Sequence, residues 1–192
     1  MKKVLLTSLS SLLVVSAASA MDFSPYIALR GGYNMTSAAL SNAGTTDGNG
    51  FLIGASIGTE LYKNTVMGLR AEIEYNYITS YDMDGSDATN STILANVFAD
   101  FDTATTLTPY VSLGIGYGWT TITINTVLGD IDMDDSNMAW QLGAGISYAL
   151  LDNMKLDLGY RYLNSTNFEM PIANTELDIE SHQIYLGARL TF

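Results

Sequence analysis

The side chains best suited to chemistry are charged residues that recur at every second position of short segments. Arg70, Glu72 and Glu74 form one such series, and Lys155 and Asp157 form another. Residues two apart on an extended strand share a face and lie only ~7 Å apart. Glu72 and Glu74 could therefore work as a carboxylate pair in hydrolysis. Because Arg70 lies on the same face, ordinary ion pairing explains the series better.

His182 is the only histidine and follows Glu180 and Ser181 directly. This grouping resembles a nucleophile with its base and would suit a hydrolase. Adjacent residues of a strand point to opposite faces, however, so Ser181 and His182 should diverge. We find no glycine-rich phosphate loop, no metal-ligand cluster and no nucleophile elbow. The sequence therefore predicts neither an enzyme nor a cofactor.

Acidic residues gather in two polar segments. Asp130, Asp132, Asp134 and Asp135 fall within six residues, and a smaller cluster holds Asp82, Asp84 and Asp87. The first spacing resembles a calcium-binding loop, but position 135 is not the required turn glycine and position 141 is Gln, not Glu. We therefore predict no specific metal site. A solvated acidic loop is expected, with weak divalent bridging to lipopolysaccharide as the alternative.

Eight segments of alternating polarity would position these residues. In the last one, His182, Ile184, Leu186 and Leu190 share a face that ends on Phe192. Segments of ~10 residues with this alternation, in an even number, are typical of a transmembrane β-barrel. We predict an all-β, eight-stranded antiparallel up-and-down barrel with strands at residues 26–34, 51–61, 66–77, 91–101, 109–119, 138–148, 154–162 and 181–192.

The connections between the predicted strands alternate in length. Residues 62–65, 102–108 and 150–153 are short links. The other four are longer and polar, and we expect them to be extracellular loops: residues 35–49, 79–90, 120–137 and 163–179. Short periplasmic turns opposite longer external loops are the rule in outer-membrane barrels, which places both termini on the periplasmic side.

The amino terminus reads as a cleaved signal peptide. Lys2 and Lys3 precede an apolar stretch at residues 4–15, and Ala18 and Ala20 fit the small-x-small cleavage pattern. We therefore predict a signal at residues 1–20 and one barrel domain at residues 21–192. No later stretch approaches the ~20 apolar residues of a membrane helix. The chain has no Cys, which excludes disulfides and thiol chemistry.

A soluble barrel would also show alternation, with its apolar face turned inward. Two features favour a membrane barrel. Aromatic residues on the apolar face concentrate near the long connections, as expected for a membrane-interface girdle: Tyr33, Phe51, Tyr75, Tyr77, Tyr117, Trp119, Trp140, Tyr160 and Tyr162. The charged residues share the Gly- and Ser-rich face and would form an interior polar network: Arg30, Glu60, Arg70, Glu72, Glu74, Asp100, Lys155, Asp157, Arg161 and Arg189. In so narrow an interior, a packed plug of paired charges fits better than a gated pore.

The overall charge is strongly acidic. The whole chain carries a formal charge of −12, and removal of two lysines with the signal would leave −14. Such a charge argues against nucleic acid as a partner.

Together these features resemble the small outer-membrane barrels that include the OmpA membrane domain, OmpX, Ail and the Opa-like surface antigens. The segments PYVSLGIGYGW, AWQLGAGISYAL and MKLDLGYRYL carry the likeness to the Opa-like branch. The resemblance implies location in the cell outer membrane, among lipid and lipopolysaccharide. It also implies recognition of a C-terminal strand ending on Phe192 by the barrel assembly machinery.

By the same resemblance, the expected role is a surface antigen or adhesin whose four loops contact a host surface, a matrix protein or environmental molecules. A monomer is expected. The alternatives are a structural protein that maintains the outer membrane without a ligand, a narrow pore and, least favoured, a lipid-modifying enzyme.

Overall fold

The chain forms eight β-strands that follow one another without a helix between them in the described part. The computed structural model describes residues 23–40, 44–83, 86–126, 129–170 and 175–192; near the hairpin ends (38–40, 44–46, 80–83, 86–88, 122–126, 129–135, 166–170, 175–179) it describes the backbone alone. No helix in these residues is long and apolar enough to cross a membrane. The strands are β1 (Ser24–Leu40), β2 (Gly44–Lys63), β3 (Met67–Met83), β4 (Ser86–Phe101), β5 (Leu107–Thr126), β6 (Gly129–Leu151), β7 (Met154–Met170) and β8 (Thr175–Thr191).

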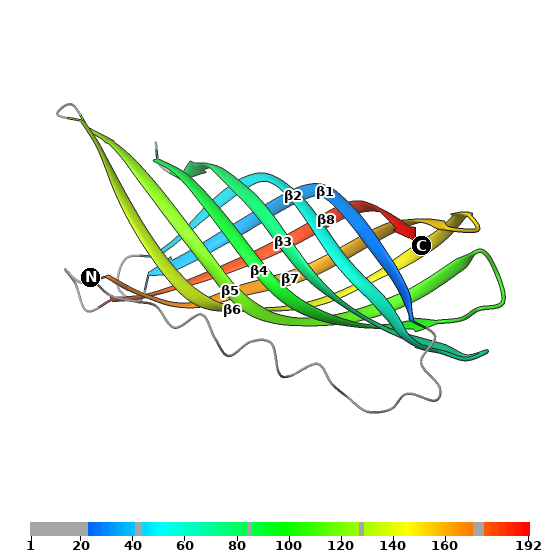
Figure 1. The fold of residues 1–192 in the computed structure, drawn as a ribbon. Helices are drawn as coiled ribbons and strands as arrows, with labels where there is room; N and C mark the ends of the chain where they lie inside the picture. Colours follow the sequence, from blue (N-terminus) through cyan, green and yellow to red (C-terminus); the bar gives the residue numbers. More distant parts are fainter. Residues whose placement is uncertain (1–22, 41–43, 84–85, 127–128, 171–174) are drawn as a thin grey trace, which may run out of the picture.

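The strands close into a barrel in which every strand pairs with its neighbours in the sequence. All pairs are antiparallel, and β1 closes the cylinder against β8, from Tyr26 opposite Thr191 to Leu40 opposite Leu177. Figure 1 shows the strands steeply inclined around a common axis. The predicted eight-stranded antiparallel up-and-down barrel is thus confirmed.

Burial alternates along each strand with the period of two that the sequence predicted. On β1, Ala28 and Arg30 are 2% and 4% exposed, whereas the intervening Leu29 is 66% exposed. The polar side chains therefore line the inside and the apolar ones cover the outside. This distribution is the reverse of a water-soluble protein and matches a cylinder surrounded by lipid.

One end of the barrel carries three short links and both ends of the described chain, at the right of Figure 1. In the link after β2, the Asn64 side chain accepts hydrogen bonds from the backbone nitrogens of Val66 and Met67, at 2.8 and 2.7 Å. In the link after β4, Asp102 accepts one from the backbone of Ala104, which has a φ of 54°. Side chains of the links thus accept hydrogen bonds from backbone N–H groups at the positions where strand pairing ends.

The four stretches predicted as long loops are for the most part strand, so that part of the prediction was wrong. β5 and β6 remain paired up to Thr126 opposite Gly129, well inside the expected loop at residues 120–137. Residues 35–49, 79–90 and 163–179 likewise contain strand and pairing. The alternation of polarity fades in these stretches of the sequence, whereas the pairing of two strands needs only their backbone groups. These four projecting pairs, at the end of the barrel that is predicted to be extracellular, are called the extracellular hairpins below.

The interior changes character along the barrel axis. Toward the hairpins, buried polar side chains such as Asn34 and Gln183 are accompanied by an apolar cluster: Leu52, Ile78, Leu94, Ala139, Leu163 and Tyr185. Toward the short links, along β3, Ile78 is followed by the charged Glu74, Glu72 and Arg70. Leu94 and Phe98 are apolar residues at positions of β4 that alternate with the outward-facing ones; they point inward and are 0% and 3% exposed.

Candidate functional site

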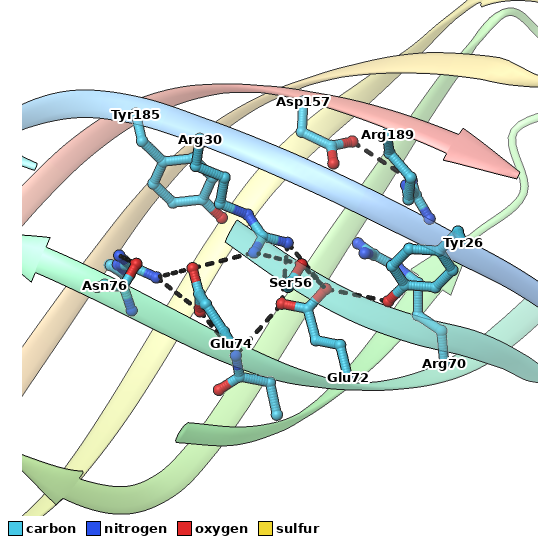
Figure 2. A network of polar contacts seen from close by, with 12 residues as sticks. Tyr26, Arg30, Ser56, Arg70, Glu72, Glu74, Asn76, Asp157, Tyr185 and Arg189 are labelled. Atoms are coloured by element: carbon cyan, nitrogen blue, oxygen red, sulfur yellow. Dashed lines mark hydrogen bonds and ion pairs between the residues drawn. The ribbon is translucent and has the colours of Figure 1, made fainter. Parts of the chain in front are cut away.

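A chain of alternating charges crosses the middle of the barrel interior (Figure 2). Arg161 of β7 bonds Glu74 of β3 at 2.9 Å, and Glu74 in turn pairs with Arg30 of β1 at 3.0 Å. Arg30 reaches on to Glu72 at 2.9 Å, and Glu72 accepts a hydrogen bond from the Tyr26 hydroxyl at 3.0 Å. This series, Arg161–Glu74–Arg30–Glu72, is called the ladder below. It ties three strands together through the centre of the barrel.

Neutral side chains satisfy the remaining polar atoms of the ladder. The Asn96 amide donates to Glu74 at 2.8 Å, and the Ser56 hydroxyl donates to Glu72 at 3.2 Å. Arg161 donates to the side-chain oxygens of Asn76 and Gln183. A buried charge is tolerated only when it is both paired and hydrogen-bonded, and the ladder meets both conditions.

Three further ion pairs lie between the ladder and the short links. Arg70 Nε bonds Asp100 at 2.9 Å, and Arg189 pairs with Asp157 at 3.3 Å. At the mouth, Lys155 approaches Glu60 at 3.8 Å. The Lys155 and Glu60 side chains are partly exposed, whereas both arginines are fully buried. A cavity of about 40 Å³ lies at this mouth. This mouth, at the end of the barrel that is predicted to be periplasmic, is called the periplasmic mouth below.

The structure places all ten charged residues of the predicted network inside the barrel or at its mouth: five basic (Arg30, Arg70, Lys155, Arg161, Arg189) and five acidic (Glu60, Glu72, Glu74, Asp100, Asp157). Their formal charges cancel. The pairing differs from the simplest expectation, because Arg70 bonds Asp100 on the next strand rather than Glu72 on its own. The interior is therefore a neutral, packed plug.

The predicted network did not include the aromatic side chains of this plug. Tyr26, Tyr110 and Tyr185 are at most 3% exposed, and the Tyr110 and Tyr185 hydroxyls lie 3.0 Å apart. The Arg70 guanidinium lies 3.8 Å from the centre of the Phe98 ring. The inward tyrosines lie over glycines of nearby strands: Gly159 is paired with Tyr185, and a Cβ at Gly159 would lie 2.6 Å from the Tyr110 hydroxyl. In the sequence, glycines at the inward-facing positions were the signal that could have indicated these buried aromatic side chains.

The predicted girdle residues lie on the outer face. Eight of the nine are at least 40% exposed, and Tyr162 is half-buried: Tyr33, Phe51, Tyr75, Tyr77, Tyr117, Trp119, Trp140 and Tyr160 are the eight. Several of them contact one another, as Tyr33 and Phe51 do with ring centroids 6.1 Å apart. Phe192 at the carboxyl end is 72% exposed, and its backbone nitrogen donates to Pro25.

His182 also lies on the outer face, in a small aromatic group. Its Nδ1 is 2.6 Å from the Tyr160 hydroxyl, and its ring lies 5.4 Å from that of Tyr162. Ser181 points into the barrel, where its hydroxyl meets Thr36 at 3.1 Å. The two side chains therefore diverge, and no Ser–His pair forms.

Among the residues whose side chains are described, no group of three or more His, Asp or Glu is arranged to hold a metal ion. The side chains of Asp82, Asp84, Asp87, Asp130, Asp132, Asp134 and Asp135 lie outside that part, as does the predicted signal at residues 1–20.

A closed barrel with an apolar outside and an ion-paired inside defines an integral protein of the outer membrane. The family described as outer membrane protein beta-barrel domain matches residues 5–192, so the chain belongs to that family. The predicted family and location in the outer membrane are thus confirmed.

The chain is similar to PagN, an outer membrane protein of Salmonella typhimurium, with 25% identity over 134 residues. This match covers 58% of the chain and 56% of PagN, so the chain spans little more than half of that relative.

Solved structures share the fold. The Neisserial surface protein NspA matches with a TM-score of 0.63 and 21% identity, covering 86% of this chain and 97% of NspA. Ail, the attachment invasion locus protein of Yersinia pestis, matches with a TM-score of 0.51 and 16% identity, covering 87% of this chain and 98% of Ail. An outer membrane enzyme and an outer membrane protease are also similar, so the fold by itself does not decide against catalysis.

Proposed function

We propose that this chain is a surface protein of the adhesin type, whose extracellular hairpins contact host or environmental molecules. The observation that carries the proposal is the contrast between a filled interior and projecting hairpins. The ladder and the apolar cluster occupy the centre of the barrel. A path for solutes is therefore not favoured, and the exposed ends of the strands remain as the surface for interactions.

The hairpins suit recognition because the backbone pairing between their two strands stiffens them. On β5, Trp119 of the girdle lies opposite Ser136, and pairing continues for seven more residues to Thr126. This amounts to roughly 23 Å of paired strand beyond the girdle. Figure 1 shows the β5–β6 hairpin projecting beyond its neighbours. A stiff hairpin loses little conformational entropy when it binds a partner.

Charge narrows the class of partner. Residues 35–49, 79–90, 120–137 and 163–179 contain eleven Asp and Glu and no Lys or Arg. One of the similar structures is Ail in complex with the heparin analogue sucrose octasulfate. We do not expect such a polyanion to bind here, because no basic residue would meet it. We expect basic partners, or anionic ones such as lipopolysaccharide bridged by divalent cations.

Other parts of the barrel serve membrane insertion in this proposal. The girdle, with Trp119 and Trp140 among its residues, lies at the lipid–water interface. The C-terminal strand with Phe192 is recognised by the barrel assembly machinery. The mature barrel begins after residue 20 and acts as a monomer. It has no enzymatic activity, so His182→Ala should leave every function intact.

The test is adhesion by a non-adherent laboratory bacterium that expresses the chain on its surface. The partners offered are host cells and matrix proteins with basic and acidic surfaces. The matched control carries short turns in place of the four hairpins, with equal surface assembly verified. Binding that disappears with the hairpins, and weakens with salt or chelator, supports the proposal. Unchanged binding by the short-turn barrel would contradict the proposal, and no binding by either barrel would favour the structural alternative.

A further inference from the structure

The wall of the barrel separates beyond the girdle between β6 and β7. Pairing of these two strands ends where Ala139 lies opposite Ser165. Pairing of β6 with β5 continues past this point for ten residues of β6, to Gly129 opposite Thr126. β7 also continues, to Met170, but there it pairs with β8. Figure 1 shows the β5–β6 and β7–β8 hairpins pointing in different directions at the left.

The other junctions between strands stay closed nearer to the strand ends. β8 and β1 are paired up to Leu177 opposite Leu40, and β4 and β5 up to Asp87 opposite Thr123. At the periplasmic mouth, the pairs on the two sides of each strand end within a few residues of one another. Among the described residues, β6 is therefore the strand that extends farthest past one of its neighbours.

The outermost part of β6, residues 129–135, is consequently an open strand edge, called the β6 edge below. Within the described part of the chain its strand partner is β5 alone. One row of its backbone N–H and C=O groups thus lies beside no described strand, and such a row is a template for a further extended chain. Residues 120–126 of β5, which pair with it, are rich in Thr and Ile and favour an extended hairpin.

The charge of the β6 edge decides which chain it can accept. Four of its seven residues are Asp, and none is Lys or Arg. A second copy of this chain would place an acidic strand against an acidic strand, and like charges directly opposite each other destabilise strand pairing. Opposite charges across a strand pair stabilise it. Asp130, Asp132 and Asp134 occupy alternate positions, which matches a partner with a basic residue at every second position.

We infer that the β6 edge binds an extended basic segment of a polypeptide, which adds to the β5–β6 hairpin as a further strand. Backbone hydrogen bonds supply the affinity in this mode of recognition, and side chains at alternate positions supply the selectivity. The inference rests on the proposed function, and it narrows the partner from basic surfaces in general to a basic chain that can be extended.

The first test measures how a fluorescent peptide, in which Lys alternates with Val and Thr, binds to the unmodified barrel in a non-ionic detergent. An analogue of the same charge is methylated at its central backbone nitrogens, so it cannot pair as a strand. We expect the peptide to bind and the analogue to bind roughly tenfold or more weakly. The bound peptide should also slow amide hydrogen exchange in residues 129–135. Equal binding by both peptides, or unchanged exchange, would overturn the inference.

The second test reverses the charge of the β6 edge with the double variant D132K/D134K. Affinity for the basic peptide should fall roughly tenfold or more, and a peptide with Glu in place of Lys should bind better than before. The matched control D178K/E180K makes the same change of charge on β8, where both positions are paired with β1. It should lower the affinity much less. An equal loss in both variants would reduce the effect to long-range attraction and overturn the inference.

The two proposals fail in different ways. If the chain adheres through its hairpins but binds neither basic peptide, the inference is wrong and the proposed function stands. Adhesion that survives replacement of all four hairpins would contradict both. The comparison of the two peptides uses the unmodified barrel, so it decides even if a charge-reversed variant does not fold.

Discussion

The strongest single perturbation of the interior is Glu74→Gln. Glu74 is 1% exposed, and its two oxygens accept from Arg161 at 2.9 and 3.0 Å, from Arg30 at 3.0 Å and from Asn96 at 2.8 Å. The substitution keeps the shape of the side chain and removes its charge. Its new amide group would donate toward two guanidinium groups that also only donate.

The loss of stability caused by Glu74→Gln depends on which hydrogen-bond acceptors each arginine retains. Arg30 retains Glu72, whereas Arg161 retains only the neutral oxygens of Asn76 and Gln183. Breaking a buried pair by removing one partner costs about 3–5 kcal/mol. Because neutral acceptors remain, we expect about 3 kcal/mol, which is a large part of the roughly 5–15 kcal/mol that stabilises a typical protein.

The assay is urea unfolding of the barrel refolded into lipid vesicles, followed by the fluorescence of the two tryptophans, Trp119 and Trp140. A double-mutant cycle with Arg161→Gln isolates the pair, and E74Q/R161Q should cost less than the sum of the single variants. Glu180→Gln is the matched control, since Glu180 is exposed and accepts a hydrogen bond from the Tyr162 hydroxyl at 2.7 Å. It should cost less than about 1 kcal/mol.

Two results would refute this reasoning. If Glu74→Gln costs no more than Glu180→Gln, the ladder does not hold the barrel together. If the costs of Glu74→Gln and Arg161→Gln simply add, the two side chains are not coupled as the 2.9 Å contact requires.

Three further outcomes are expected. Gly159→Ala should destabilise the barrel by about 1–3 kcal/mol, because its Cβ would overlap Tyr185 and Tyr110. Gly31→Ala on the outer face is the control: its Cβ meets nothing within 4 Å, so it should be neutral. Equal unfolding midpoints of the two variants would contradict the packing. Tyr110→Phe should cost about 1 kcal/mol by removing the 3.0 Å hydroxyl contact with Tyr185, and an unchanged unfolding midpoint would show that the contact contributes nothing. In planar bilayers the unmodified barrel should not conduct, because the ladder closes its centre, and steady conductance steps would speak for the pore instead.

Much of the fold could be predicted from alternation alone. The period of two is imposed by lipid on one face and packed side chains on the other, so it is visible wherever the strands cross the membrane. The alternation of polarity fades in the sequence from Thr120 to Asn137, although the backbone of β5 and β6 stays paired there. Strand ends outside the bilayer therefore could not be found from polarity.

The sequence predicts which charged residues lie in the interior, but not which of them contact one another. Parity alone puts Arg30, Glu74 and Arg161 on one face, and the structure has all three inside. Which of them touch depends on the stagger of strands around the closed cylinder, and Glu74 and Arg161 are 87 residues apart in the chain. Inward aromatics such as Tyr185 occupy alternating positions on the same face as the charged residues, but the predicted network named charged side chains alone.

The central claim is that the barrel is a closed frame and that the hairpins carry the activity. The most direct measurement compares the adhesion of two variants at equal surface density. One carries the interior double substitution E74Q/R161Q, and the other has a short turn in place of residues 120–137. We expect the interior variant to adhere as the unmodified chain does and the hairpin variant to lose much of its binding. Loss of adhesion by the interior variant, with binding retained by the hairpin variant, would contradict the claim.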